Sequence, residues 1–291
     1  MIRRLAVVGV GLIGGSLARA LREAGQVGEV IGCGRGRQNL ERGVALGVID
    51  RYTHGVAEAV DGADMVFVAV PLGAMRDAFA AMRDRLAPDA VVTDGGSAKA
   101  SVAADARTAL GDRIASFVPG HPIAGTERTG VEASFATLYR NRRVILTPLP
   151  ETAPAAMQRV EAMWRACGAE VTAMSVEHHD ELLAATSHLP HMLAFGLVDA
   201  LARMKENDEI FRYAAGGFRD FTRIASSSPV MWRDICVANR EALSRMLERF
   251  AEEMGDLADT IRRGDGDHLL EIFSRAKAAR DRYVDGMRGE E

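Results

Sequence analysis

Cysteine is scarce in this sequence. Only three cysteines occur among 291 residues, at Cys33, Cys167 and Cys236, and none of them forms a C-x-x-C pair. An odd and widely scattered set provides neither a disulfide framework nor a cysteine-based zinc site. The cysteine content therefore fits a protein of the reducing cytoplasm.

An excess of positive charge and long hydrophobic runs are also missing. Lys and Arg number 36 against 40 Asp and Glu, a formal net charge of -4, so nucleic acid is not an expected partner. The longest apolar stretches, such as residues 63–72, are shorter than the ~18 residues that a membrane-spanning helix needs. Arg3 and Arg4 precede an apolar run as in a signal peptide, but Gly9 and Gly11 interrupt it. We interpret this run as a first β-strand and expect no membrane segment.

The composition and the length predict a folded protein of two domains. Hydrophobic residues make up 48% and charged residues 26% of the chain, which are ordinary values for a globular protein. Up to about residue 175, short β-branched runs alternate with helical patterns, which predicts a doubly wound parallel α/β sheet. The predicted strands span residues 5–10, 30–32, 65–70, 90–93, 117–118, 144–146 and 170–174.

The rest of the sequence is helical in pattern. Apolar residues recur at spacings of three and four from Leu182 to Leu201, and further helices are predicted over 231–254 and 267–287. We therefore expect an α/β domain over 1–174 and an all-α domain over 175–291.

A glycine-rich turn joins the first strand to an amphipathic helix over 12–24. It reads G-x-G-x-x-G, in which glycine allows a tight turn and close approach of a pyrophosphate to the helix N-terminus. The turn predicts a dinucleotide site, and Val70 and Pro71 at the end of the strand over 65–70 are expected beside it. The motif residues expected to contact the cofactor are Gly9, Gly11, Leu12, Ile13 and Gly14.

The second predicted strand lacks the acidic residue that binds the ribose of NAD. Gly34 stands near that place, and Arg35 and Arg37 follow it. Without a carboxylate, the two arginines can pair with the 2′-phosphate of NADP, or they are simply solvated loop residues. We lean slightly to NADP and leave NAD open.

Two further loops carry candidate functional residues after predicted strands. Ser97 follows the strand over 90–93, and His121 lies between Gly120 and Pro122 on a loop at the expected cofactor edge. A single histidine is more often a structural hydrogen-bonding residue, but this position favours catalysis.

The helical half contains histidine pairs and an arginine. His188 and His191 are three residues apart, and residues 177–180 add further histidines and acids, but the spacing is not H-E-x-x-H and we expect no metal. Arg223 stands among apolar neighbours, so we expect it to be partly buried against an anion. That anion is either Asp220 or a substrate carboxylate.

Taken together, these motifs resemble the prephenate/arogenate (cyclohexadienyl) dehydrogenase family. The resemblance covers nearly the whole chain and is carried by residues 8–16, 94–97, 120–127, 187–191, 216–225 and 231–234. It implies a Rossmann-type domain followed by an all-α dimerisation domain in a homodimer. It also implies NAD(P)-dependent oxidative decarboxylation of prephenate to 4-hydroxyphenylpyruvate, or of arogenate to tyrosine.

The resemblance also implies roles for individual residues. His121 would take the proton of the ring hydroxyl, with Ser97 beside the same hydroxyl, and Arg223 would bind a substrate carboxylate. Residues implied to line or approach the same pocket are Thr126, Glu127, His179, His188, His191 and Gly216. Two other functions stay open: a different Rossmann-type dehydrogenase that acts on a β-hydroxy acid, and a catalytically silent NADP sensor.

Overall fold

The computed structural model describes residues 1–126, 128–205 and 207–288. The chain divides into two compact units, residues 1–243 and the remainder from residue 244 onward. Near residue 174, where we predicted a domain boundary, the secondary structure changes from strands to helices, but this change lies inside the first unit. The domain boundary at this position therefore stays a prediction.

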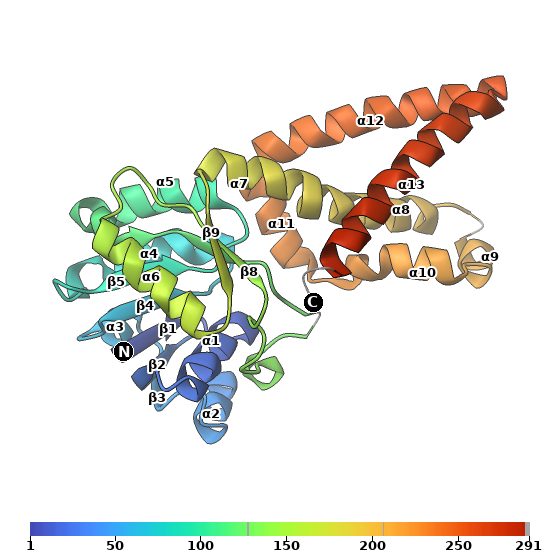
Figure 1. Cartoon of the computed structure of the whole chain (residues 1–291). Helices are drawn as coiled ribbons and strands as arrows, with labels where there is room; N and C mark the ends of the chain where they lie inside the picture. The colour runs from blue at the N-terminus through green and yellow to red at the C-terminus, as the bar shows by residue number, and fades with distance from the viewer. Residues whose placement is uncertain (127, 206, 289–291) are drawn as a thin grey trace. The chain divides into compact units, whose positions relative to one another are not determined.

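A six-stranded parallel sheet with flanking helices forms the N-terminal part, as the sequence predicted (Figure 1). The strand order is β3-β2-β1-β4-β5-β6. The strands are β1 (Ile2–Val8), β2 (Val27–Cys33), β3 (Arg51–Thr53), β4 (Met65–Val68), β5 (Val91–Asp94) and β6 (Phe117–Val118). Their helices are α1 (Leu12–Glu23), α2 (Arg37–Ala45), α3 (Val56–Val60), α4 (Met75–Met82), α5 (Lys99–Leu110) and α6 (Pro154–Ala166).

Both faces of this sheet are buried, which explains why its strands read as continuous apolar runs. Because successive side chains point to opposite faces, Leu5 and Val7 join the core that contains Leu17 of α1. Ala6 and Val8 join a second core, which contains Phe79 of α4. Helices packed on both faces therefore hold the carboxyl ends of the strands in fixed positions.

The last two predicted strands, over 144–146 and 170–174, do not belong to the parallel sheet. Strands β7 (Gly120–Pro122), β8 (Arg143–Leu146) and β9 (Glu170–Ala173) form a separate sheet, in which β7 runs antiparallel to β8 and β9 runs parallel to β8. A single parallel sheet was therefore wrong for the two predicted strands that became β8 and β9, and β7 was not predicted as a strand. The doubly wound class is confirmed by the six-stranded parallel sheet, in which only β3 was not predicted.

Helices follow β9, as predicted. They are α7 (Val176–Leu183), the π-helical turn η5 (Ala184–His188), α8 (Leu189–Ala202), α9 (Asn207–Arg212), α10 (Gly216–Thr222), the 3₁₀ turn η6 (Arg223–Ser226) and α11 (Pro229–Ala238). The predicted helix over 231–254 is wrong in one respect, because it is interrupted at Asn239, between α11 and α12 (Arg240–Arg263).

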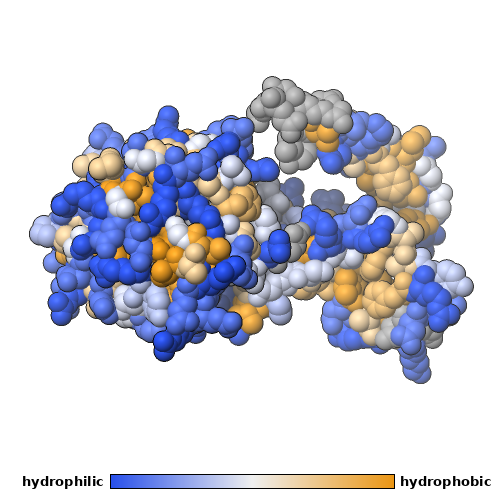
Figure 2. Space-filling view, turned by 90° about the horizontal axis from the view of Figure 1, so that it is seen from below, coloured by the Kyte–Doolittle hydropathy of each residue, from blue (hydrophilic) through white to orange (hydrophobic). Residues whose placement is uncertain are grey.

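The second compact unit consists of α12 from residue 244 onward and of α13 (Gly266–Arg288). Hydrophobic side chains are exposed on both helices, among them Met254, Ile261, Leu270 and Phe273. Figure 2 shows further hydrophobic residues on the surface of the helical part of the chain. Within the described ranges, no helix is both long and apolar enough to cross a membrane.

Candidate active site

The glycine-rich turn lies at the carboxyl end of β1, and two of its glycines have no room for a side chain. Gly9 has a φ of 104°, and a Cβ there would lie 2.3 Å from the carbonyl oxygen of Ala69. A Cβ at Gly14 would lie 2.2 Å from the carbonyl oxygen of Gly9. The turn can therefore be built only with glycine at these two positions.

The same turn leaves the start of α1 open to a ligand. A Cβ at Gly11 would meet no heavy atom within 4 Å, and no side chain caps the first turn of α1. Such a helix N-terminus offers N–H groups and a partial positive charge to a phosphate. Leu12 and Ile13 form the first turn of this helix. These features fit the pyrophosphate of a dinucleotide.

Val70 and Pro71 follow β4, the parallel neighbour of β1. The strand order reverses between β1 and β4, and doubly wound sheets bind nucleotides at this position. Gly9, Gly11, Val70 and Pro71 therefore lie at one edge, as predicted, and this edge is where a nicotinamide dinucleotide would bind.

Arg35 and Arg37 lie just beyond β2 and are both exposed. The Arg37 Nε, at the start of α2, donates to the carboxylate of Glu41, one turn further along the helix, at 2.8 Å. The Gly34 carbonyl oxygen lies 2.8 Å from the Nδ1 atom of His54. Gly34 directly follows β2, where the ribose-binding acid of an NAD site is expected, so this place has no carboxylate in the structure either.

A buried ion pair connects the end of β5 with β7. The Lys99 Nζ donates to Asp94 Oδ2 at 2.5 Å and to the Gly120 carbonyl at 2.7 Å, and both side chains of the ion pair are 0% exposed. The Asp94 carboxylate also accepts the N–H of Gly96 at 2.7 Å and that of Gly120 at 3.0 Å. Because Gly120 precedes His121, this network fixes the backbone on which His121 stands.

His121 is part of strand β7 and is buried, so its predicted place on a loop was wrong. In the antiparallel pairing of β7 with β8, His121 stands opposite Ile145. Burial lowers the pKa of His121 well below its ordinary value, and the neighbouring His179, Lys99 and His188 lower that pKa further. The imidazole is therefore neutral at pH 7 and able to accept a proton.

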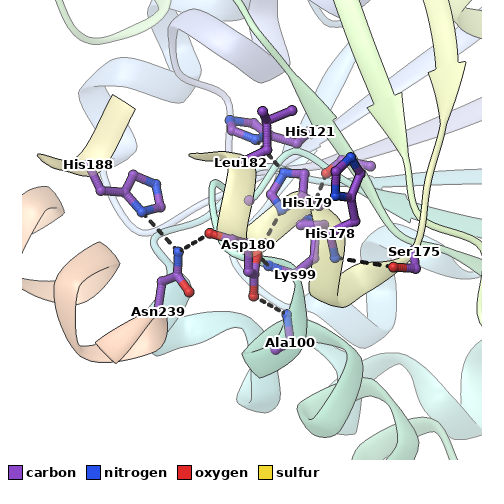
Figure 3. Close-up of polar contacts among 12 residues, drawn as sticks. Lys99, Ala100, His121, Ser175, His178, His179, Asp180, Leu182, His188 and Asn239 are labelled. Carbon is purple, nitrogen blue, oxygen red and sulfur yellow. Dashed lines mark hydrogen bonds and ion pairs between the residues drawn. The ribbon is translucent and has the colours of Figure 1, made fainter. Parts of the chain in front are cut away.

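His179 and Asp180 on α7 extend from His121 in a chain of hydrogen bonds (Figure 3). The His121 Nδ1 lies 2.9 Å from His179 Nε2, and the His179 Nδ1 lies 2.7 Å from Asp180 Oδ1. The Asp180 carboxylate also accepts the backbone N–H groups of Lys99 and Ala100, each at 2.8 Å. Asp180 thus joins α7 to the first turn of α5.

His188 is connected to the same residue by a different route (Figure 3). The Asn239 Nδ2 donates to the Asp180 carbonyl at 2.9 Å and lies 3.0 Å from His188 Nδ1. Since a carbonyl oxygen can only accept, the amide nitrogen of Asn239 must face it, and His188 Nδ1 is then an acceptor. Burial lowers the pKa of His188 to about 4, so it is a neutral imidazole with its hydrogen on Nε2.

His191 stacks on Trp232, with ring centroids 3.7 Å apart, and His188 meets the edge of the same indole at 6.0 Å. The Trp232 Nε1 is buried and has no hydrogen-bond partner among the described residues. Burial lowers the pKa of His191, and the charge of Arg223 lowers it further, while the hydrogen bond to the Ser187 carbonyl raises it. Arg223 itself is exposed at the start of η6, and the expected partial burial was wrong.

The remaining predicted residues lie outside this buried cluster. Ser97 is half-buried after β5, Thr126 is exposed after β7 and accepts the N–H of Arg128, and Gly216 begins α10. Glu127 lies outside the described residues. Across residues 1–126, 128–205 and 207–288, no group of three or more His, Cys, Asp or Glu side chains is arranged to hold a metal ion.

Four residues of the cluster received no role from the sequence. Asp180 was considered only as a metal ligand, and Lys99, Trp232 and Asn239 were not singled out. Lys99 closely follows the motif over 94–97 and Trp232 lies in the motif over 231–234, so these motifs could have drawn attention to both residues. For Asn239 the sequence offered none.

Comparisons with known proteins agree over most of the chain. Residues 17–173 match the family model of the prephenate dehydrogenase nucleotide-binding domain, and residues 175–275 match that of the prephenate dehydrogenase dimerization domain. The chain is 39% identical to the cyclohexadienyl dehydrogenase of Zymomonas mobilis, with 96% of each chain covered.

Two solved structures are also similar. One is prephenate dehydrogenase from Aquifex aeolicus in complex with hydroxyphenyl propionate and NAD⁺, with 38% identity, a TM-score of 0.90, and 96% of this chain and 98% of that chain covered. The other is Synechocystis arogenate dehydrogenase, with 27% identity, a TM-score of 0.82, and 96% of this chain and 99% of that chain covered.

Proposed function

The chain belongs to the prephenate dehydrogenase family, and from this premise we infer that it is an NAD(P)-dependent oxidoreductase of tyrosine biosynthesis. Its reaction is the oxidative decarboxylation of prephenate to 4-hydroxyphenylpyruvate, of arogenate to tyrosine, or of both. The observation that carries this function is the buried neutral imidazole of His121, held by β7 beside the carboxyl end of β5.

The residues of the chain divide the chemistry between them. A dinucleotide whose pyrophosphate was held by the glycine-rich turn and the start of α1 would supply a nicotinamide ring as the acceptor of a hydride from the carbinol carbon of the substrate. His121 takes the proton of the hydroxyl on that carbon, which raises the electron density that drives hydride loss. The ring carboxylate then leaves as CO₂, and the ring becomes aromatic. Arg223 holds a substrate carboxylate and thereby positions the ring, with His191, Ser97 and the other predicted residues around it.

A direct assay tests this function. Purified protein is incubated with prephenate or arogenate and with NAD or NADP, and the absorbance of the reduced cofactor is followed. Formation of reduced cofactor is expected in at least one combination. A β-hydroxy acid dehydrogenase or a silent NADP sensor would give none, and that result would refute the proposal.

We propose that the enzyme uses NADP at least as well as NAD, because Arg35 and Arg37 face no carboxylate at position 34. A Cβ at Gly34 would meet Leu40 at 3.5 Å, an ordinary van der Waals distance, so Gly34→Asp is accommodated. Its charge should lower kcat/KM for NADP by on the order of 10-fold and favour NAD. Gly34→Asn has the same size without the charge and is the matched control. A strong preference of the wild-type enzyme for NAD would contradict this proposal.

Arg223→Ala should raise the KM for prephenate by roughly 10- to 100-fold and change kcat less, because a charge-assisted clamp is lost while the base stays in place. Arg223→Lys should recover only part of the binding, since an ammonium cannot make the two parallel hydrogen bonds of a guanidinium. Arg219→Ala, an exposed arginine of α10, is the control. An unchanged KM in folded Arg223→Ala would make Asp220 the better partner.

We also propose that the enzyme is a cytoplasmic homodimer assembled through its helical half. The matched dimerization-domain model and the exposed apolar side chains of α12 and α13 support this assembly, since a partner subunit would bury them. Light scattering should report twice the chain mass of 31.3 kDa. A mass of one chain at micromolar concentrations would rule the dimer out.

A further inference from the structure

His121, His179 and Asp180 form a continuous chain of hydrogen bonds that is almost closed to solvent. The three residues are 9%, 0% and 5% exposed. The linking distances of 2.9 Å and 2.7 Å are both of hydrogen-bond length, and Figure 3 shows the three side chains in sequence. Water therefore does not compete for these bonds, and each of them must join one donor to one acceptor.

Asp180 determines which atoms donate and which accept in this series of hydrogen bonds. Burial raises the pKa of this carboxyl, but the hydrogen bonds from His179 and from the N–H groups of Lys99 and Ala100 outweigh burial and lower it. The group is therefore an ionised carboxylate, which can only accept. Its partner, the His179 Nδ1, must carry a hydrogen.

The donor and the acceptor of the His121–His179 hydrogen bond follow from the neutral state of both imidazoles. Burial lowers the pKa of His179, although the Asp180 hydrogen bond opposes this effect, so its Nε2 holds a lone pair. The His121 Nδ1 then has to donate to it. In a neutral ring this leaves the His121 Nε2 with a lone pair, which is the atom that a general base requires.

We propose that His179 and Asp180 are positioning residues that fix His121 in the tautomer with hydrogen on Nδ1 and a lone pair on Nε2. The proposal rests on the proposed function, in which His121 is the base. Neither residue needs to touch the substrate, which revises the pocket-lining role that the sequence analysis gave to His179.

The other charged and titratable groups near His121 leave this arrangement in place. The Lys99 Nζ of α5 is bound to Asp94 of β5 and to the Gly120 carbonyl. The Nδ1 of His188, in η5, accepts from Asn239. The His121 Nδ1 therefore has its partner in His179.

Nitrogen NMR of ¹⁵N-histidine-labelled enzyme tests the tautomer directly, because a protonated and a bare ring nitrogen resonate far apart. The signals of His121 are those that disappear in His121→Asn. The expected result is hydrogen on Nδ1 and none on Nε2 of His121 at pH 7. Hydrogen on Nε2 instead would overturn the proposal, whatever the activity of the enzyme.

Kinetics supply the second measurement. His179→Leu removes the acceptor and should lower kcat by on the order of 10²-fold with KM for prephenate nearly unchanged. His179→Gln keeps an acceptor oxygen and should retain most of the activity. His178→Gln, on the neighbouring exposed histidine, is the matched control and should match the wild type.

The outcomes separate the two hypotheses. A wild-type kcat in His179→Leu would overturn the positioning role while leaving the function intact. A wild-type protein that shows the expected tautomer but oxidises neither prephenate nor arogenate would overturn the proposed function while supporting the tautomer assignment. If His179→Leu does not fold, the NMR result and His179→Gln decide the question.

Discussion

Replacement of His121 by asparagine is expected to lower kcat by about 10²- to 10⁴-fold, the usual contribution of a general base. The amide of asparagine can still donate to His179 Nε2, so the fold and the KM for substrate should change little. Steady-state kinetics on a variant whose thermal unfolding matches the wild type would measure this effect. A near-normal kcat in His121→Asn would move the base role elsewhere, with His191 as the next candidate.

The pH dependence of kcat gives an independent measure of the same residue. A free imidazole has a pKa of about 6.5. Because burial lowers the pKa of His121, wild-type kcat should stay level down to pH 6.5 and decline only at lower pH, where the imidazole becomes protonated. An acidic limb that is unchanged in His121→Asn would belong to another group.

Replacement of Lys99 by methionine is expected to destabilise the fold by about 3–5 kcal/mol, because it leaves the buried carboxylate of Asp94 without its cation. Methionine has nearly the length of lysine, so little packing is lost. Two N–H groups would still bind Asp94, but neither carries a charge. Urea unfolding at a fixed protein concentration would measure the difference.

The control for this measurement is an ion pair at the surface. Arg107 binds Glu151 at 2.9 Å, with side chains 46% and 39% exposed. Arg107→Met should therefore change the free energy of unfolding by less than about 1 kcal/mol. Equal losses in Lys99→Met and Arg107→Met would show that burial of the Lys99–Asp94 pair is not what makes it important.

Much of the fold was predictable because local patterns agreed with tertiary burial. The apolar run that became β4 is buried on both faces of the sheet, so its hydrophobicity alone identified it. The glycine-rich turn was predictable because Gly9 and Gly14 stand where any side chain would collide with the backbone. In both cases one short segment contained the whole signal.

Other features depended on distant partners and left no local signal. Strand β3 is a three-residue edge strand, too short to show a pattern. Asn239 interrupts a long amphipathic run, and its side chain binds His188 and the carbonyl of Asp180. The sequence placed Asp180 among possible metal ligands, because an acid beside histidines looks the same whether it binds a metal or orients an imidazole.

The hydrogen bonds of Asp180 also bear on how enzymes of this architecture could be recombined. The two matched family models meet between residues 173 and 175, and that junction separates His121 from both His179 and Asp180. A chimaera joined there would keep its dinucleotide turn but receive the orienting carboxylate from the other parent. Since Asp180 also accepts the N–H groups of Lys99 and Ala100, the transplanted α7 would have to fit the recipient's α5. A crossover placed after α8 would instead inherit the base and its orienting residues as one unit.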